Sequence, residues 1–165
     1  EIHALPMQSE FKEHDDATVL RAFLADHPEW NPVVHDTPDH HDIATIIAGC
    51  DIVVSERFHA IVVAAILGRP TVGLLYDVKV AELAEQLGIH DRSVDINAPF
   101  DPADLAAAIV DTAALGADEG MRLCLQAGAY RAELDDHFGE VRRWLDDPAG
   151  NRIWAAAVGD TRRSS

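Results

Sequence analysis

Short apolar runs alternate with segments of helical periodicity along most of the chain, and this alternation constrains the fold more than any other feature. The run Ile52-Val53-Val54 is continuously β-branched, which is typical of a central strand in a parallel sheet. Strands that alternate with helices form right-handed βαβ units, in which helices cover both faces of the sheet. The sequence therefore predicts an α/β fold with a doubly wound parallel sheet. Strands are expected over residues 2–7, 32–35, 52–55, 71–76 and 93–96.

Capping residues and stop signals mark the helices between these runs. Asp15-Asp16 and Asp42 are candidate N-caps, and Gly68-Arg69-Pro70 ends the segment before it, because Gly and Pro stop helices. That segment is apolar almost all round, so we expect it to be buried. Helices are expected over about residues 15–26, 42–49, 57–67, 78–87, 101–115 and 118–145. The apolar residues of the last helix are expected to pack against the fold; these are Leu123, Leu134, Phe138, Val141 and Leu145.

The length of 165 residues suits one domain, and we find no internal repeat, low-complexity tract or interdomain linker. We expect residues 1–146 to form a Rossmann-like domain with a long C-terminal helix, and residues 147–165 to form a flexible tail. The chain begins with Glu1 instead of an initiator Met, as expected for a piece of a longer protein.

The charge and hydropathy of the chain disfavour two classes of partner. The formal net charge of −16 repels nucleic acid and anionic lipid, since binding to phosphate backbones depends on Lys and Arg. No apolar run reaches the roughly 18 residues that a membrane span needs. The N-terminus shows no basic segment followed by an apolar stretch, so no signal peptide is expected.

The two cysteines and the run Asp39-His40-His41-Asp42 give no sign of a metal site. Cys50 and Cys124 lie far apart and lack metal-binding or disulfide spacing, so we expect free thiols in a reducing compartment, and hence a cytoplasmic location. Consecutive side chains on a turn point apart, so the Asp39–Asp42 run favours a loop followed by a helix cap. We expect neither a metal nor a cofactor.

The most informative segment is the one from Asp51 to Ala60, where a buried strand leads into a buried helix. Ser55, Arg57 and His59 lie at the strand's carboxyl end and in the first helical turn. Free backbone N–H groups and the helix dipole favour an anion at such a position. Arg57 adds a fork of donors suited to carboxylate or phosphate. The structural alternative is that Arg57 pairs with Glu56 or Asp51 and that His59 is a core histidine.

A second cation follows the next strand, in the sequence Tyr76-Asp77-Val78-Lys79. Lys79 falls in the first turn of a helix, and neighbouring strands would bring it near Arg57 and His59. Since the chain has only 13 basic residues against 29 acidic ones, cations at two helix starts indicate an anion-binding cleft. The alternative is a solvated Lys79 that pairs with Asp77 or Glu82.

The order of these motifs resembles the polysaccharide pyruvyl transferase family. It consists of a strand, Ser55-x-Arg57-x-His59, a buried Ala-rich helix, Gly68-x-Pro70, an apolar strand and Tyr76-Asp77-x-Lys79. The opening Leu5-Pro6-Met7-Gln8, followed by Asp15-Asp16, also resembles the start of the family's C-terminal domain. The resemblance covers roughly residues 3–115. Phe58 stands where Leu is usual, and Glu56 where an uncharged residue is frequent.

The resemblance implies a fold, a reaction and partners. The family is similar in fold to two-domain GT-B glycosyltransferases, and its members transfer a pyruvyl group from phosphoenolpyruvate to sugar hydroxyls, giving a ketal in polysaccharide biosynthesis. This chain would be the donor-binding half, completed by an N-terminal domain and a saccharide acceptor. His59 would be catalytic; the substrate-binding residues would be Arg57, Lys79, Ser55, Tyr76 and Gln8. We expect the isolated chain to lack half of its active site.

Two other functions remain open from the sequence. A GT-B-type glycosyltransferase or a sugar-nucleotide epimerase would bind a nucleotide-sugar at the same helix termini. Such families typically place an acidic residue to hold the ribose, and none stands out here. A non-catalytic anion-binding or protein-interaction domain could retain the same fold.

Overall fold

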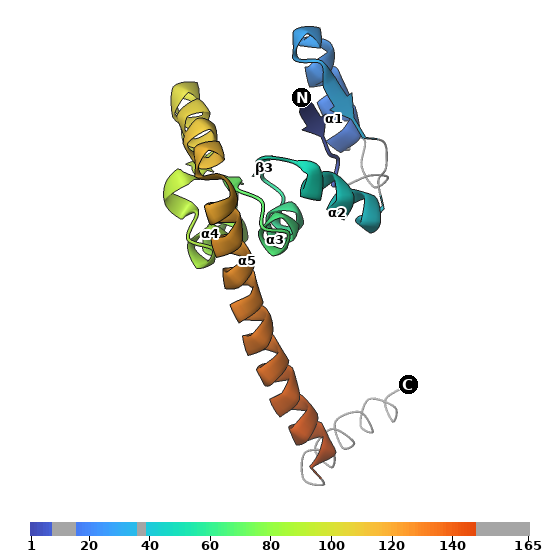
Figure 1. Cartoon of the computed structure of the whole chain (residues 1–165), viewed down its shortest axis with the longest axis vertical. Coiled ribbons are helices and arrows are strands. Elements are labelled where there is room, and N and C mark those ends of the chain that lie inside the picture. Colours follow the sequence, from blue (N-terminus) through green and yellow to red (C-terminus); the bar gives the residue numbers. More distant parts are fainter. Residues whose placement is uncertain (8–15, 36–38, 148–165) are drawn as a thin grey trace, which may run out of the picture. The chain divides into compact units, whose positions relative to one another are not determined.

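The computed structural model describes residues 1–7, 16–35 and 39–147, in which strands and helices alternate (Figure 1). The strands are β1 (Ile2–Ala4), β2 (Pro32–Val34), β3 (Val53–Ser55), β4 (Thr71–Leu75) and β5 (Val94–Asp95). The helices are α1 (Asp16–Ala25), α2 (His40–Gly49), α3 (Phe58–Ile66), α4 (Val78–Gln86) and α5 (Pro102–Asp146). Two 3-10 helices, η1 and η2, cover Pro28–Trp30 and His90–Arg92. The predicted α/β class is therefore confirmed.

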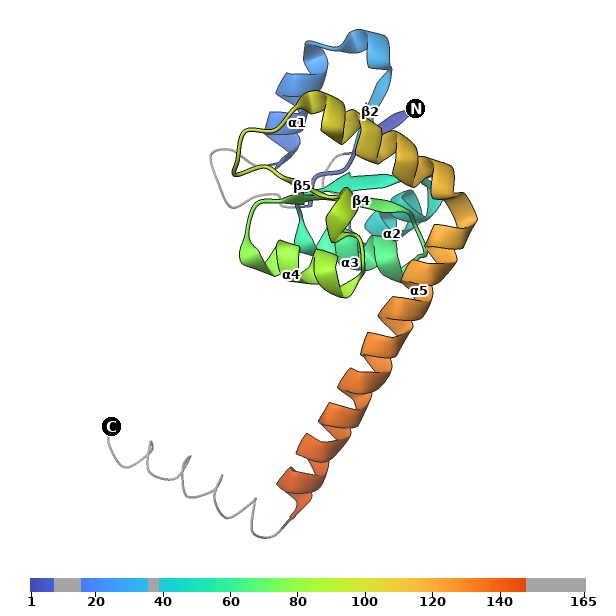
Figure 2. The ribbon, with the colours of Figure 1, turned by 90° about the vertical axis from the view of Figure 1, so that its left-hand side faces the viewer.

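Within the described residues all the strand pairs are parallel, as the sequence predicts, and they fall into two sheets. β1 pairs with β2, and a three-stranded sheet has the order β3-β4-β5. Val53 lies opposite Thr71, and Leu74 lies opposite Val94. Parallel neighbours need crossover connections, which α3 and α4 supply here, and Figure 2 shows these two helices on the same side of the strands. The carboxyl ends of all three strands thus lie along one edge of this sheet.

The hydrophobic core lies between α3, α4, β4 and the middle of α5. Ile61, Val80, Ile89 and Leu123 are fully buried at its centre. The expectation that α3 is buried all round was wrong. Its buried residues Ala60, Ile61, Ala64 and Ala65 share one face, whereas Phe58 is 38% exposed and Ile66 is 57% exposed.

The start of α2 differs from the sequence prediction by two residues. The N-cap is Asp39, whose carboxylate accepts hydrogen bonds from the backbone N–H groups of His41 (2.8 Å) and Asp42 (2.9 Å). Asp42, the predicted cap, is the third helical residue, and its carboxylate accepts from the N–H of Asp39. Such a capping box satisfies two exposed donors reciprocally. The run therefore contains a helix cap, as predicted, but the cap is Asp39, and the predicted loop is wrong because His40 and His41 already belong to α2.

A non-helical residue divides α5 into two helical segments, as the sequence predicts. Gly116 has φ 54° and ψ −135°, a conformation that glycine tolerates better than other residues. Four residues later, Gly120 lies against the backbone of Gly68, where a Cβ atom would stand 2.2 Å from the carbonyl oxygen. The middle of α5 therefore approaches the end of α3 more closely than a side chain would permit.

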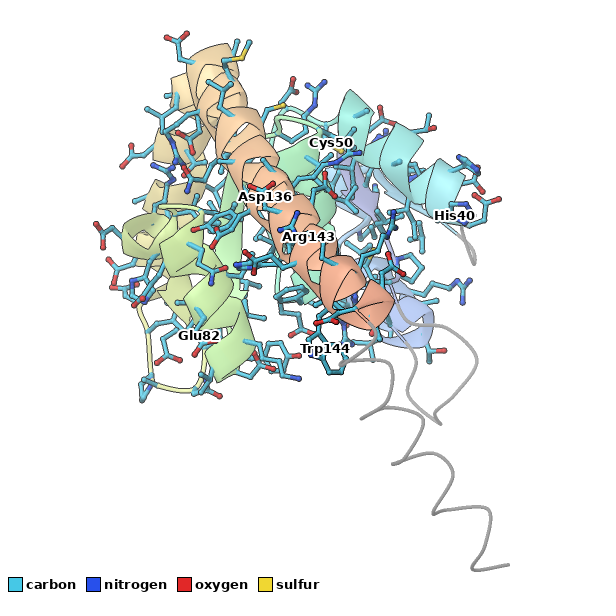
Figure 3. The ribbon with its side chains drawn as sticks, turned by 90° about the horizontal axis from the view of Figure 1, so that it is seen from below. His40, Cys50, Glu82, Asp136, Arg143 and Trp144 are labelled. Atoms are coloured by element: carbon cyan, nitrogen blue, oxygen red, sulfur yellow. The ribbon has the colours of Figure 1, made fainter. Side chains whose placement is uncertain are left out.

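The chain divides into two compact units, Glu1–Ala127 and the part that starts at Gly128. The described part of the second unit is the end of α5, whose Asp136, Arg143 and Trp144 are labelled in Figure 3. Leu123, in the first unit, is buried as expected. The expectation of burial was wrong for the later residues Leu134, Phe138, Val141 and Leu145, which are exposed. The predicted tail lies, from residue 148 on, outside the described residues.

Within the described ranges, no helix combines the length and apolar character that crossing a bilayer requires.

Candidate anion-binding site

Ser55 and Arg57 form the turn that joins β3 to α3. Ser55 is the last residue of β3, and its Oγ accepts a hydrogen bond of 2.9 Å from the backbone N–H of Arg57. This local bond turns the chain out of the strand, as short polar side chains commonly do. Arg57, with φ −81° and ψ 120°, is the N-cap of α3. The sequence prediction that these two residues lie at a strand tip and a helix start is confirmed.

The guanidinium of Arg57 binds a carboxylate that is distant in sequence. Its Nη2 lies 2.5 Å from Oδ1 of Asp16, and its Nε lies 3.2 Å from Oδ2. A weaker ion pair joins Nε to Glu56 Oε1 at 3.6 Å. The hydrogen bond that Arg57 donates to Asp16, opposed by partial burial, raises the pKa of Arg57 above its ordinary value. The structural alternative was therefore right about Glu56, but the principal partner is Asp16, and Asp51 does not pair with Arg57.

The N-terminus of α3 differs from the described starts of α2, α4 and α5, each of which has a side-chain cap. Asp77 caps α4 by accepting from the N–H of Val80 at 2.9 Å, and Asp101 accepts from the N–H of Ala103 at the start of α5. No side chain in the described ranges caps α3. The N–H groups of its first turn therefore remain available to an acceptor, and the helix dipole favours an anion there.

A cavity of about 530 Å³ opens beside this helix start. Ser55, Glu56 and Arg57 line it together with Asp16 and His3, and the remaining walls are mostly apolar. His3 Nδ1 lies 2.9 Å from His35 Nε2, so this imidazole is held by the neighbouring strand. The backbone N–H of Met7 donates to Asp16 Oδ2 at 3.2 Å. The cavity thus combines a paired guanidinium with an apolar interior.

His59 and Lys79 are exposed and line neither this cavity nor the hollow beside Tyr76 that is described below. His59 is the second residue of α3, and its ring meets Phe58 edge-on, with centroids 5.7 Å apart. Lys79 is the second residue of α4. Across the described parts of the chain, neither side chain has an ion pair. The alternatives of a core histidine and of a Lys79 paired with Asp77 or Glu82 were therefore wrong, because His59 is exposed and Asp77 instead caps α4.

Tyr76 follows the carboxyl end of β4 and lines a separate hollow of about 500 Å³. The charge of Asp77 raises the pKa of its phenol, while Arg57 acts in the opposite direction. Tyr76 comes three residues after Gly73, which lies opposite Ser55 in the neighbouring strand, so Tyr76 and Arg57 stand at the same edge of the sheet. Gln8, the remaining predicted site residue, lies outside the described residues.

Sequence reasoning missed the role of Asp16 and a group of residues around Tyr76. Asp16 was assigned only to a helix cap, and its 41-residue separation from Arg57 leaves no trace in local spacing. Asp95 and Asn97 line the hollow beside Tyr76. The sequence could have indicated these two residues, because they come at the carboxyl end of a predicted strand, where ligands bind in parallel sheets.

Comparisons with known proteins agree with the motif order. Residues 1–78 match the family model described as polysaccharide pyruvyl transferase, which confirms the resemblance inferred from the sequence. The chain is also 24% identical over 96 residues to the amylovoran biosynthesis protein AmsJ of Erwinia amylovora. That alignment covers 56% of this chain and 23% of AmsJ, so the chain spans about a quarter of that relative's length. No solved structure matches the chain.

Proposed function

From the match of residues 1–78 to the polysaccharide pyruvyl transferase family, we propose that this chain supplies the donor-binding half of such an enzyme. The donor is phosphoenolpyruvate, and the product is a pyruvate ketal on a pair of sugar hydroxyls. The Rossmann-like domain of this proposal covers residues 1–146 of a GT-B-like protein. An N-terminal domain of the same enzyme completes the active site, and the reaction takes place in the cytoplasm.

The observation that supports this proposal best is the uncapped start of α3. The described starts of α2, α4 and α5 are each capped by an Asp, whereas α3 begins with Arg57 and carries His59 in its first turn. A cation at this end opposes the helix dipole by about 0.3–1 kcal/mol. An anion that binds the N–H groups, the guanidinium and the imidazole together reverses that penalty.

The chemistry of phosphoenolpyruvate suits this arrangement. The first acceptor hydroxyl adds to C2 and a proton adds to C3. C2 thereby becomes tetrahedral, and C3 becomes a methyl group. The C2–O bond to phosphate then breaks, and phosphate departs with the bonding electron pair. The second hydroxyl attacks C2, loses its proton and closes the ketal. Negative charge develops on the departing phosphate, where fixed positive groups lower the barrier most.

The proposed roles follow from this sequence of steps. His59, exposed at the start of α3, protonates or hydrogen-bonds the departing phosphate. Arg57 and the N–H groups of α3 hold its oxygens, and Ser55 fixes the turn that presents them. Lys79 neutralises the donor as a point charge from the start of α4. Tyr76 and Gln8 are assigned to the substrate as well.

The test is a binding titration of the 165-residue chain, monitored by ligand-observed NMR. Phosphoenolpyruvate is the ligand in one series and a uridine diphosphate sugar in the other. The variants are Arg57→Gln, His59→Gln and Lys79→Gln. Each is expected to weaken phosphoenolpyruvate binding about tenfold, since each removes a charged hydrogen bond. Circular dichroism confirms that each variant is folded.

The matched control is His137→Gln, which changes an exposed histidine of α5 in the second compact unit. Its affinity for phosphoenolpyruvate is expected to equal that of the unmodified chain. Selective binding of the nucleotide-sugar, with no response to phosphoenolpyruvate, would instead favour a glycosyltransferase or epimerase and overturn the proposal.

A further inference from the structure

The hollow beside Tyr76 occupies a ligand-binding position in the sheet. It has a volume of about 500 Å³ and lies where β4 and β5 end. Ligands of open α/β sheets bind at the carboxyl ends of their strands. The polar residues that line it are Tyr76, Asp77, His90, Ser93, Asp95 and Asn97.

Hydrogen bonds between the strands hold the walls of this hollow in place. Asn97 Nδ2 donates to the carbonyl oxygens of Leu75 (3.3 Å) and Tyr76 (3.0 Å). Ser93 Oγ accepts from the N–H of Gly73 at 3.0 Å and donates to the carbonyl of Ile89 at 2.9 Å. Since these groups are satisfied by the fold, the hollow is formed before any ligand enters.

Other polar atoms in the hollow are left open. Asp95 Oδ1 accepts from the backbone N–H and the side chain of Asn97, at 2.9 and 3.1 Å. Asp95 Oδ2 and Asn97 Oδ1 have no hydrogen-bond partner within the described part of the chain. The ring of His90 is exposed, and Tyr76 is 41% exposed. The open groups are thus two oxygen acceptors and one aromatic face, since Nδ1 of His90 lies 4.0 Å from Oδ1 of Asp91.

The charges of the hollow select against an anion. Asp77 and Asp95 contribute carboxylates, and no Lys or Arg lines its walls in the described structure. A phosphate or carboxylate would be repelled here, in contrast to the cavity beside Arg57. A neutral ring with several hydroxyls fits instead, because hydroxyls donate to carboxylate and amide oxygens. The C–H face of such a ring can pack on the phenol ring of Tyr76.

We propose that this hollow binds a neutral pyranoside ring and forms the acceptor subsite of the pyruvyl transfer. The assignment as acceptor rests on the proposed function. Tyr76 follows β4 and Arg57 follows β3, and these strands are neighbours with Ser55 opposite Gly73, so the two sites lie along the same edge of the sheet. A sugar packed on Tyr76 therefore lies at the sheet edge that also carries the proposed donor site.

The test is an NMR titration of the isotope-labelled 165-residue chain with methyl β-D-galactopyranoside and methyl α-D-glucopyranoside. At least one is expected to shift the amide signals of Tyr76, Asp95 and Asn97. Asp95→Asn keeps the acceptor for the Asn97 N–H but removes the charge, and about tenfold weaker binding is expected. Tyr76→Leu removes the aromatic face and is expected to weaken binding to a similar extent.

The control is Asp136→Asn, which makes the same charge change at an exposed carboxylate of α5 in the second compact unit, outside the lining of this hollow. It is expected to leave pyranoside binding unchanged. Absence of binding by both sugars, or equal affinity in the Asp95→Asn, Tyr76→Leu and unmodified chains, would overturn the subsite.

Titration with phosphoenolpyruvate separates this inference from the proposed function. Asp95→Asn is expected to leave phosphoenolpyruvate affinity unchanged, and His59→Gln is expected to leave pyranoside affinity unchanged. Pyranoside binding at Tyr76 without any phosphoenolpyruvate binding would uphold a saccharide site and refute the donor assignment. Phosphoenolpyruvate binding in the hollow itself, lost in Asp95→Asn, would refute the neutral-ligand subsite.

Discussion

The guanidinium of Arg57 binds the carboxylate of Asp16 through two nitrogen atoms, with contacts of 2.5 Å and 3.2 Å. Asp16 is the first residue of α1, so this ion pair ties the start of one helix to the start of α3. The same carboxylate accepts from the N–H of Met7. The pair fixes the orientation of Arg57 and also offsets part of its charge beside the cavity.

Removing this carboxylate is expected to strengthen anion binding. In Asp16→Asn the Arg57 guanidinium keeps a hydrogen-bond partner but is no longer neutralised. Phosphoenolpyruvate should then bind about fivefold more tightly, which corresponds to about 1 kcal/mol. The free energy of unfolding should fall by up to about 1 kcal/mol, because the lost ion pair is partly solvated. Calorimetric titration and chemical denaturation measure the two effects.

The control for that experiment is Asp26→Asn, an exposed carboxylate just beyond the other end of α1. It changes the net charge equally but lies outside the cavity lining. Equal affinities for phosphoenolpyruvate in the Asp16→Asn and Asp26→Asn chains would contradict a competing role for Asp16.

The close approach of Gly120 to Gly68 predicts a large effect of a single methyl group. In Gly120→Ala the new Cβ would lie 2.2 Å from the Gly68 carbonyl oxygen, so the backbone must move. We expect a loss of at least about 2 kcal/mol in the free energy of unfolding. Gly128→Ala, on the same helix, meets no atom within 4 Å and should stabilise by about 0.5–1 kcal/mol through helix propensity. Urea denaturation measures the free energy of unfolding of both variants. Similar free energies for Gly120→Ala and Gly128→Ala would refute the clash.

Glu119 is expected to be essential for the packing of α5. It is only 6% exposed and forms ion pairs with Arg92 and with Arg122, whose Nη2 lies 2.6 Å from Glu119 Oε1. Arg122 also donates to the carbonyl of Leu87 at 2.8 Å. Glu119→Gln keeps the shape but removes the charge between two guanidinium groups, and should cost about 2 kcal/mol. Glu133→Gln, at an exposed position of the same helix, should have little effect.

The same carboxylate makes stability dependent on pH. Burial raises the pKa of Glu119, but the hydrogen bond from Arg122 and the charge of Arg92 outweigh it and lower the pKa below its ordinary value. A lowered pKa stabilises the fold at pH values above the ordinary range for a glutamate. That contribution is lost as the pH falls through the lowered value. The melting temperature should therefore fall less steeply between pH 7 and pH 3 in Glu119→Gln than in the unmodified chain. Parallel curves of melting temperature against pH for the two chains would contradict this.

The two thiols should differ in reactivity. Cys124 is exposed, whereas Cys50 is half-buried and its Sγ donates to the carbonyl of Ile46 at 3.3 Å. Burial raises the pKa of Cys50, which reduces its thiolate fraction at neutral pH. Iodoacetamide at pH 7.5 should label Cys124 first in the folded chain and both residues in urea, as read by peptide mass spectrometry. Preferential labelling of Cys50 in the folded chain would contradict the half-buried position of this thiol.

Local signals predicted most of the secondary structure. Gly68 and Gly88 end helices at φ 63° and 64°, conformations that follow from the stop signals in the sequence. The error at α2 arose because Asp39 and Asp42 are both good capping residues and form one capping box. The exposed face of α3 was missed because hydrophobic periodicity shows that a helix is apolar, but not how much of it is covered.

For the candidate site, the sequence by itself determined which residues stand at the ends of β3 and β4, because short-range caps and strand runs fix such positions. It placed Ser55 and Arg57 at one strand tip and Tyr76 at the next. Only the tertiary structure decided that Arg57 binds Asp16, that His59 and Lys79 are exposed, and that Asp95 and Asn97 share a hollow with Tyr76. The contacts among these join residues that are 19 to 41 positions apart in the chain, so they depend on how the elements pack, which local periodicity does not encode.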